Sequence, residues 1–274
     1  MSHPKNFFSA LQMLLALVVS VPAVAQERVV IDGSTGMLPL ATALAKAYQE
    51  KYPDSEVDLG KGLGTGARIR ALAEGKIQIA LASHGLKPEE LKKEKLKIIE
   101  VAKGAIVFAV NSNVPISTVT EAQICDIYSG KLTDWQAMGG PGAAIAVFTR
   151  PPAEVDPEVI RAKVACFKNL KEVETARVMA KGTDMATALA ETPYAIGMTS
   201  MTVVEQSGGK VKALKLNNLA PNPENVRKGD YYLARDFFFV VKAESTPSVK
   251  KFLEFVRSPD GDHVILKNGA VSLR

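Results

Sequence analysis

The chain has 274 residues, with 34 lysines and arginines against 29 aspartates and glutamates, which gives a formal net charge of +5 at pH 7. This length is enough for one large domain or for two lobes with substantial cores. The positive excess is mild and spread along the chain. It lacks the clustered basic face typical of nucleic-acid binding, so we expect no nucleic-acid partner.

The first 25 residues have the features of a secretory signal peptide. Lys5 precedes an apolar run over residues 10–19, and residues 23–25 (Ala-Val-Ala) form a small-x-small cleavage site. The apolar run is shorter than the ~20 residues needed to span a bilayer. A retained N-terminal anchor is the alternative. We expect cleavage after residue 25 and a mature chain in the periplasm.

Short apolar strands alternate with amphipathic helices along the mature chain, which predicts an α/β fold with a largely parallel sheet. The first half of the pattern has strands at residues 28–32, 56–59 and 77–81, a helix at about 38–52 and another after residue 66. Two further strands are expected near residues 98–101 and 105–110. A middle region with its own alternation follows, and the chain ends with a strand at 237–241 and two helices.

This order predicts a lobe built from both ends of the chain, with a second lobe inserted. We expect a signal peptide over residues 1–25, lobe 1 over 26–110 together with 232–274, and lobe 2 over 111–231. Only two cysteines occur, Cys125 and Cys166. An even pair in an oxidising compartment favours one disulfide, and a buried pair of free thiols is the alternative. Few histidines and no Cys-x-x-Cys motif argue against a metal site.

Each of the first three strands ends in a polar or glycine-rich turn. The carboxyl ends of the strands form one edge of an open α/β sheet, and ligands bind at that edge. Hydroxyls and free N–H groups at helix N-termini bind anions. The candidate residues are Ser34, Thr35, Gly36, Gly64, Thr65, Gly66, Ser83 and His84. The alternatives are an ordinary helix N-cap at Ser34 or Thr35, a tight glycine loop without a ligand, and a weak dinucleotide motif beginning at Gly62.

A further candidate comes from the middle region, where Arg150 ends a predicted strand. An arginine there would bring a fixed positive fork to an anion. A surface arginine paired with Glu154 or Asp156 is the alternative. No G-x-S-x-G elbow accompanies these residues, and two mature histidines do not furnish a di-metal site. We therefore expect a binding protein, not an enzyme, with no catalytic residues, no metal and no cofactor.

Several blocks resemble the periplasmic phosphate-binding proteins of bacterial ABC transporters. These are G-S-T-G-x-x-P (33–39), G-x-G-T-G (62–66), A-E-G-K-I-Q-I-A-L-A-S-H (73–84), I-C-D-I-Y-S-G-K-L-T-D-W (124–135), P-Y-A-I-G-M (193–198), G-D-Y-Y-L-A-R (229–235) and F-L-E-F-V-R-S-P-D-G (252–261). The resemblance covers nearly all of the mature chain. It implies a two-lobed periplasmic-binding-protein fold (type II-like), each lobe a mixed sheet flanked by helices. It also implies a monomer that binds a small oxyanion, phosphate or a phosphate-like anion, and delivers it to an ABC transporter permease. A membrane sensor as partner is the alternative.

The resemblance transfers the family's binding positions to Ser34, Thr35, Thr65 and Arg150. His84 stands where the family has Asp or Arg. Glu154 and Asp156 replace the serine and threonine of the family's R-x-x-x-S-G-T block. A carboxylate 4 Å from a dianion would repel it by ~4 kcal/mol per charge pair at an effective dielectric of 20. Either these acids cap the following helix and hold Arg150, or they accept a hydrogen from a protonated or organic ligand.

Overall fold

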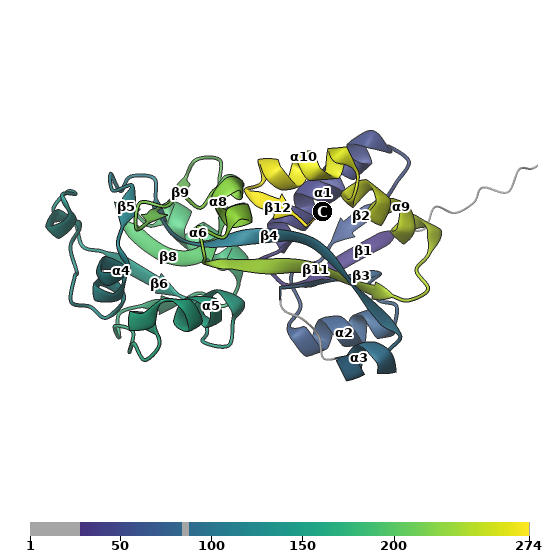
Figure 1. Cartoon of the computed structure of the whole chain (residues 1–274), viewed down its shortest axis with the longest axis horizontal. Helices are drawn as coiled ribbons and strands as arrows, with labels where there is room; N and C mark the ends of the chain where they lie inside the picture. Colours follow the sequence, from purple (N-terminus) through teal and green to yellow (C-terminus); the bar gives the residue numbers. More distant parts are fainter. Residues whose placement is uncertain (1–27, 84–87, 274) are drawn as a thin grey trace, which may run out of the picture.

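The computed structural model describes residues 28–83 and 88–273. The predicted signal peptide and His84 therefore lie outside the described residues. The described part consists of two α/β halves joined by two long strands, β4 (Leu96–Asn111) and β11 (Ala234–Lys242) (Figure 1). This is the two-lobed architecture that the sequence predicts.

The first half contains both ends of the described chain. Its elements are β1 (Val29–Gly33), α1 (Leu38–Lys51), β2 (Val57–Leu59), α2 (Thr65–Ala73), β3 (Ile79–Ala82), α3 (Pro88–Lys93), α9 (Pro247–Val256), α10 (Pro259–Lys267) and β12 (Ala270–Ser272). Each strand–helix unit has an apolar helix face turned to the sheet. In α1 the buried residues recur with helical spacing at Leu40, Leu44 and Tyr48, so the helix covers the core with one side.

The second half is formed by the middle of the chain. Its elements are β5 (Thr118–Val119), α4 (Glu121–Tyr128), the 3-10 helix η1 (Trp135–Met138), β6 (Ala146–Thr149), α5 (Val155–Lys163), the 3-10 helix η2 (Ala165–Phe167), β7 (Arg177–Val178), α6 (Gly182–Glu191), β8 (Ala195–Ser200), α7 (Met201–Glu205), β9 (Val211–Ala213), β10 (Lys215–Leu216) and α8 (Pro223–Lys228).

The main sheet has the strand order β2-β1-β3-β11-β4-β8-β6-β7, and β12 and β9 also pair with β4. The outer strands of each half pair in parallel, as expected for strand–helix–strand units. The central strands β11 and β4 are antiparallel to their neighbours. The expectation of a largely parallel sheet is therefore wrong at the centre, where the strands that connect the two halves run against the others.

A second correction concerns residues 96–111. Two strands were predicted there, but the chain forms the single strand β4. Its first part pairs with β11 and β12, and its second part pairs with β8 and β9. The polar break in the apolar pattern includes Gly104, over which the Phe237 ring lies, and a side chain there would displace that ring. Pairing on both sides keeps the backbone extended across this break.

Each half has its own apolar core. In the second half the core includes Phe108, Tyr128, Trp135 and Phe167, whose side chains are fully buried. The Tyr128 hydroxyl donates to the Phe148 carbonyl at 3.0 Å and the Trp135 indole donates to the Tyr194 carbonyl at 2.9 Å. The family-like block at residues 124–135 thus supplies core aromatic residues with satisfied polar atoms, which is a packing role.

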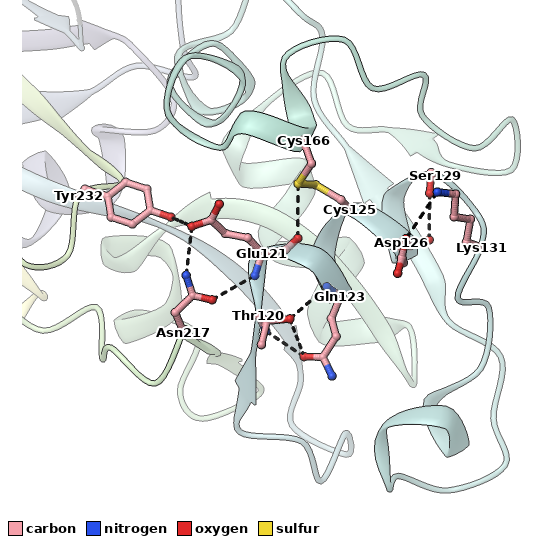
Figure 2. Close-up of a disulfide and its surroundings, with 10 residues drawn as sticks. All are labelled: Thr120, Glu121, Gln123, Cys125, Asp126, Ser129, Lys131, Cys166, Asn217 and Tyr232. Carbon is pink, nitrogen blue, oxygen red and sulfur yellow. Dashed lines mark hydrogen bonds and ion pairs between the residues drawn. A yellow bond between two sulfur atoms is a disulfide. The ribbon is translucent and has the colours of Figure 1, made fainter.

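The predicted disulfide between Cys125 and Cys166 is present and joins α4 to η2, with Cα atoms 6.2 Å apart (Figure 2). Glu121, at the start of α4, accepts hydrogen bonds from the Tyr232 hydroxyl at 2.5 Å and from the Asn217 amide at 3.0 Å. These contacts and the disulfide fix α4 to three distant segments of the chain.

Candidate functional site

The turns at the carboxyl ends of β1 and β3 lie side by side. The hydroxyls of Ser34 and Ser83 are 2.7 Å apart and share a hydrogen bond. The residue before helix α1 is Met37, with no side-chain cap, so neither Ser34 nor Thr35 acts as the predicted alternative N-cap. Neither hydroxyl is used as a cap of α1, and the structure brings Ser34 and Ser83 together as the sequence predicts.

The glycine-rich loop after β2 is held by Asp32. One carboxylate oxygen of Asp32 accepts the N–H groups of Gly33 at 2.7 Å and Gly62 at 2.8 Å. Gly62 has φ +99°, a conformation that favours glycine. Gly64 precedes helix α2, and both Gly64 and Gly66 are exposed. The backbone of Thr65 begins α2.

Three hydrogen bonds connect the two halves near these turns. The Gly182 N–H, at the start of α6, donates to the Thr35 hydroxyl at 3.0 Å. The Lys181 ammonium donates to the Lys61 carbonyl at 3.2 Å, and the Ser200 hydroxyl donates to the Gly36 carbonyl at 3.3 Å. Thr35 and Gly36 therefore face the other half, and the halves touch near the carboxyl end of β1.

Arg150 is buried, with 3% of its side chain exposed, although its predicted alternative was a surface residue. One terminal nitrogen donates to the Met179 carbonyl at 2.9 Å, and the other donates to the Glu154 carboxylate at 2.9 Å. Glu154 precedes helix α5 but makes no side-chain cap. The first alternative predicted for the acids combined capping of the helix with holding Arg150. Glu154 holds Arg150 but makes no side-chain cap. The second alternative, that an acid accepts a hydrogen from the ligand, stays a prediction.

Asp156, in the first turn of α5, pairs with a residue that sequence reasoning left out, Arg235. The terminal nitrogen of Arg235 lies 2.8 Å from the Asp156 carboxylate, and both side chains are at most 5% exposed. The guanidinium also packs on Gly36, where any side chain would collide with it. Gly36 therefore serves the close approach of Arg235 to the turn after β1.

A third buried arginine, Arg68, lies on helix α2 and is 3% exposed. Within the described part of the chain, its Nε and one terminal nitrogen have no hydrogen-bond partner. Arg68 is not among the candidates named from the sequence. Its position three residues after Thr65, one helical turn into α2, is the signal that would have found it.

These side chains form one electrostatic group, which we call the arginine cluster: Arg68, Arg150, Arg235, Glu154 and Asp156. Burial lowers the pKa of Arg68, and the charge of Glu154 opposes that shift. Burial also lowers the pKa of Arg235, where Asp156 opposes the shift and Arg150 adds to it. The fold thus holds three guanidinium groups with only two carboxylates, in a place where each uncompensated charge is costly.

The cluster also contains unsatisfied polar atoms. In the described residues, the buried Nε atoms of Arg150 and Arg235 and the Thr149 hydroxyl have no hydrogen-bond partner, and the Asp156 oxygen facing Arg235 lacks aligned hydrogen-bond geometry. Buried polar groups are normally paired in native proteins. An arrangement of several unpaired donors around excess positive charge is suited to an anion with several acceptor oxygens.

Two lobes, each contributing polar groups to a shared edge, define the class of solute-binding proteins that close around a small ligand. A family model described as a PBP superfamily domain matches residues 20–260. The chain belongs to this superfamily, and within it is PstS-like.

The relatives agree with this assignment. The phosphate-binding protein PstS of Bacillus subtilis is 27% identical over 233 residues, which cover 84% of this chain and 75% of that protein. A phosphate ABC transporter substrate-binding protein of Clostridium perfringens, solved with bound phosphate, is 30% identical with a TM-score of 0.74, covering 90% of this chain and 100% of that one. An ABC-type phosphate transport receptor of Vibrio cholerae is 27% identical with a TM-score of 0.58, covering 89% and 99%.

Two features are absent from the described residues. Across residues 28–83 and 88–273 no helix is long and apolar enough to cross a membrane. The same residues contain no group of three or more His, Cys, Asp or Glu side chains that could hold a metal ion. The relatives are substrate-binding proteins, and the chain shares their architecture.

Proposed function

We propose that this protein captures a small oxyanion between its two lobes in the periplasm and delivers it to an ABC transporter permease. The observation that carries the ligand class is Arg68, a buried guanidinium whose Nε and one terminal nitrogen have no hydrogen-bond partner among the described residues. A buried charge without a partner costs several kcal/mol in a folded protein, on the order of the free energy that a bound anion returns. Phosphate is the first candidate, because the names of the relatives specify phosphate.

In the proposed site, Arg68 and Arg150 supply positive charge from opposite lobes. The hydroxyls of Ser34 and Ser83 lie at the carboxyl ends of β1 and β3, and the resemblance adds Thr65. Thr35 contributes to closure, because its hydroxyl accepts the Gly182 N–H across the lobes. Arg235 and Asp156 form a supporting pair behind Gly36.

The proposal includes the organisation expected from the sequence. Residues 1–25 form a signal peptide that is removed on export, residues 26–110 with 232–274 form lobe 1, and residues 111–231 form lobe 2. The mature protein acts as a monomer and not as an enzyme. Support comes from the family, from the strands β4 and β11 that connect the halves, and from a disulfide, which forms in oxidising compartments.

A calorimetric and thermal-melting screen of the purified secreted protein tests the proposal, with phosphate, arsenate, sulfate and molybdate as ligands. At 100 times the dissociation constant, a bound anion stabilises the fold by ~2.7 kcal/mol. We expect binding of at least one anion, and weaker binding by Arg150→Ala. Arg70→Ala, which removes an exposed charge on α2, is the control. Absence of heat and of a melting shift with all four anions would disprove the function.

A further inference from the structure

Glu154, which accepts a hydrogen bond from Arg150, is the least constrained member of the arginine cluster. Arg150 is 3% exposed, whereas the Glu154 side chain is 45% exposed. Among the described residues, the Glu154 carboxylate hydrogen-bonds only to Arg150. It does not cap α5. Rotation of Glu154 into water therefore breaks one contact and exposes a charge that water solvates well. Arg150 has no such freedom, since its other terminal nitrogen is bound to the Met179 carbonyl.

Rotation of Glu154 changes the net charge of the arginine cluster. Arg235 and Asp156 neutralise each other as a buried pair at 2.8 Å. Arg68 and Arg150 remain, and both act on or contact Glu154. With Glu154 in place, the described cluster carries one uncompensated positive charge. With Glu154 turned out to solvent, it carries two, which matches a doubly charged anion.

We propose that Glu154 is a displaceable counter-ion. It occupies Arg150 while the site is empty, and a doubly charged tetrahedral oxyanion takes its place between Arg150 and Arg68. This inference rests on the proposed function. Its consequence is that Glu154 lowers affinity, because each binding event must first break the contact between Arg150 and Glu154. The acid at this position thus weakens the receptor without abolishing binding.

The test compares Glu154→Gln with the parent protein by calorimetry, using inorganic phosphate and, separately, sulfate. Glutamine keeps the shape of the side chain but removes its charge, so its bond to Arg150 is weaker. We expect the dissociation constant for any anion that the parent binds to fall about tenfold, the difference between a charged and a neutral hydrogen bond. Glu158→Gln is the matched control, because Glu158 is an exposed acid one turn further along α5 and should leave affinity unchanged.

The outcomes separate the inference from the function on which it rests. If the parent and Glu154→Gln bind neither phosphate nor sulfate, and the parent also fails with arsenate and molybdate, the proposed function fails. If the parent binds but Glu154→Gln binds equally or more weakly, the counter-ion role is wrong, and weaker phosphate binding would show that Glu154 accepts a hydrogen from the ligand. Glu154→Ala guards against misfolding of one variant and should also bind more tightly. A crystal structure of the phosphate-bound parent should show Glu154 turned away from Arg150, and an intact contact would overturn the inference.

Discussion

Replacement of Arg68 by methionine should stabilise the ligand-free protein and weaken its binding of anions. Methionine retains most of the apolar stem that packs around position 68 and removes the buried guanidinium. The folded state depresses the pKa of Arg68 through burial, so the charged form is disfavoured there. No carboxylate hydrogen-bonds to Arg68 in the described structure. The variant therefore loses the desolvation penalty and the attraction of Glu154, but loses no hydrogen bond among the described residues.

The size of both effects follows from the burial of Arg68. Replacement of a buried ion pair by apolar residues of similar volume is often neutral or stabilising by about 1–4 kcal/mol, and we expect about 2 kcal/mol for this guanidinium, which has no hydrogen-bonded carboxylate. For a chain of this size that is an increase in melting temperature of roughly 4–8 °C. Loss of a charge-assisted hydrogen bond to the anion costs about 1.5–3 kcal/mol. Affinity should therefore fall roughly 10- to 150-fold.

Thermal unfolding of the anion-free protein and calorimetric titration with phosphate measure the two effects together. Arg70→Met is the matched control, because Arg70 lies on the same helix but is exposed. It should change neither quantity much. A lower melting temperature for Arg68→Met would show that the guanidinium is a structural group with a satisfied environment. Unchanged phosphate affinity would remove Arg68 from the site.

Three other consequences can be measured. Replacement of both Cys125 and Cys166 by alanine should lower the free energy of unfolding by about 4 kcal/mol in the chain-entropy model, given their separation of 41 residues; denaturant unfolding that differs by less than 1 kcal/mol would contradict this. Thr35→Val removes the acceptor for the Gly182 N–H and should weaken phosphate binding about fivefold. It should also give a larger radius of gyration in X-ray scattering, and an unchanged radius would refute a role of Thr35 in closure. Burial holds the pKa of Tyr128 well above its usual value, so the unfolded state ionises first and stability falls as pH rises above 10. Tyr128→Phe should flatten that alkaline decline, and an equally steep decline would exclude Tyr128 as its source.

The order of strands and helices was predictable because each unit carries its own periodic pattern. The helix over residues 38–51, for example, buries one face at helical spacing. The single strand β4 was not predictable, because Lys103 and Gly104 interrupt its apolar run. Pairing with β11 and β12, segments more than 100 residues away, keeps those two residues extended. The antiparallel direction of β4 and β11 was not predictable either, because it is set by the chain crossing from one half to the other in β4 and back in β11.

The site was predictable only in part. Ser34, Ser83 and Arg150 follow strands, and the turn after a strand is visible in the sequence. Arg68 and Arg235 lie inside a helix and a strand, where an arginine normally marks the solvated face. Arg235 is buried against Asp156 of the other half and against the small residue Gly36, which allows its guanidinium to approach. Such contacts between distant segments leave no local pattern.

The central claim is that an oxyanion binds between the lobes on Arg68 and Arg150. A crystal structure of the protein grown with phosphate tests it most directly. We predict a tetrahedral anion with oxygens about 3 Å from both guanidinium groups, in contact with both lobes. An anion bound elsewhere, or Arg68 and Arg150 unchanged and without an anion at saturating phosphate, would contradict the account.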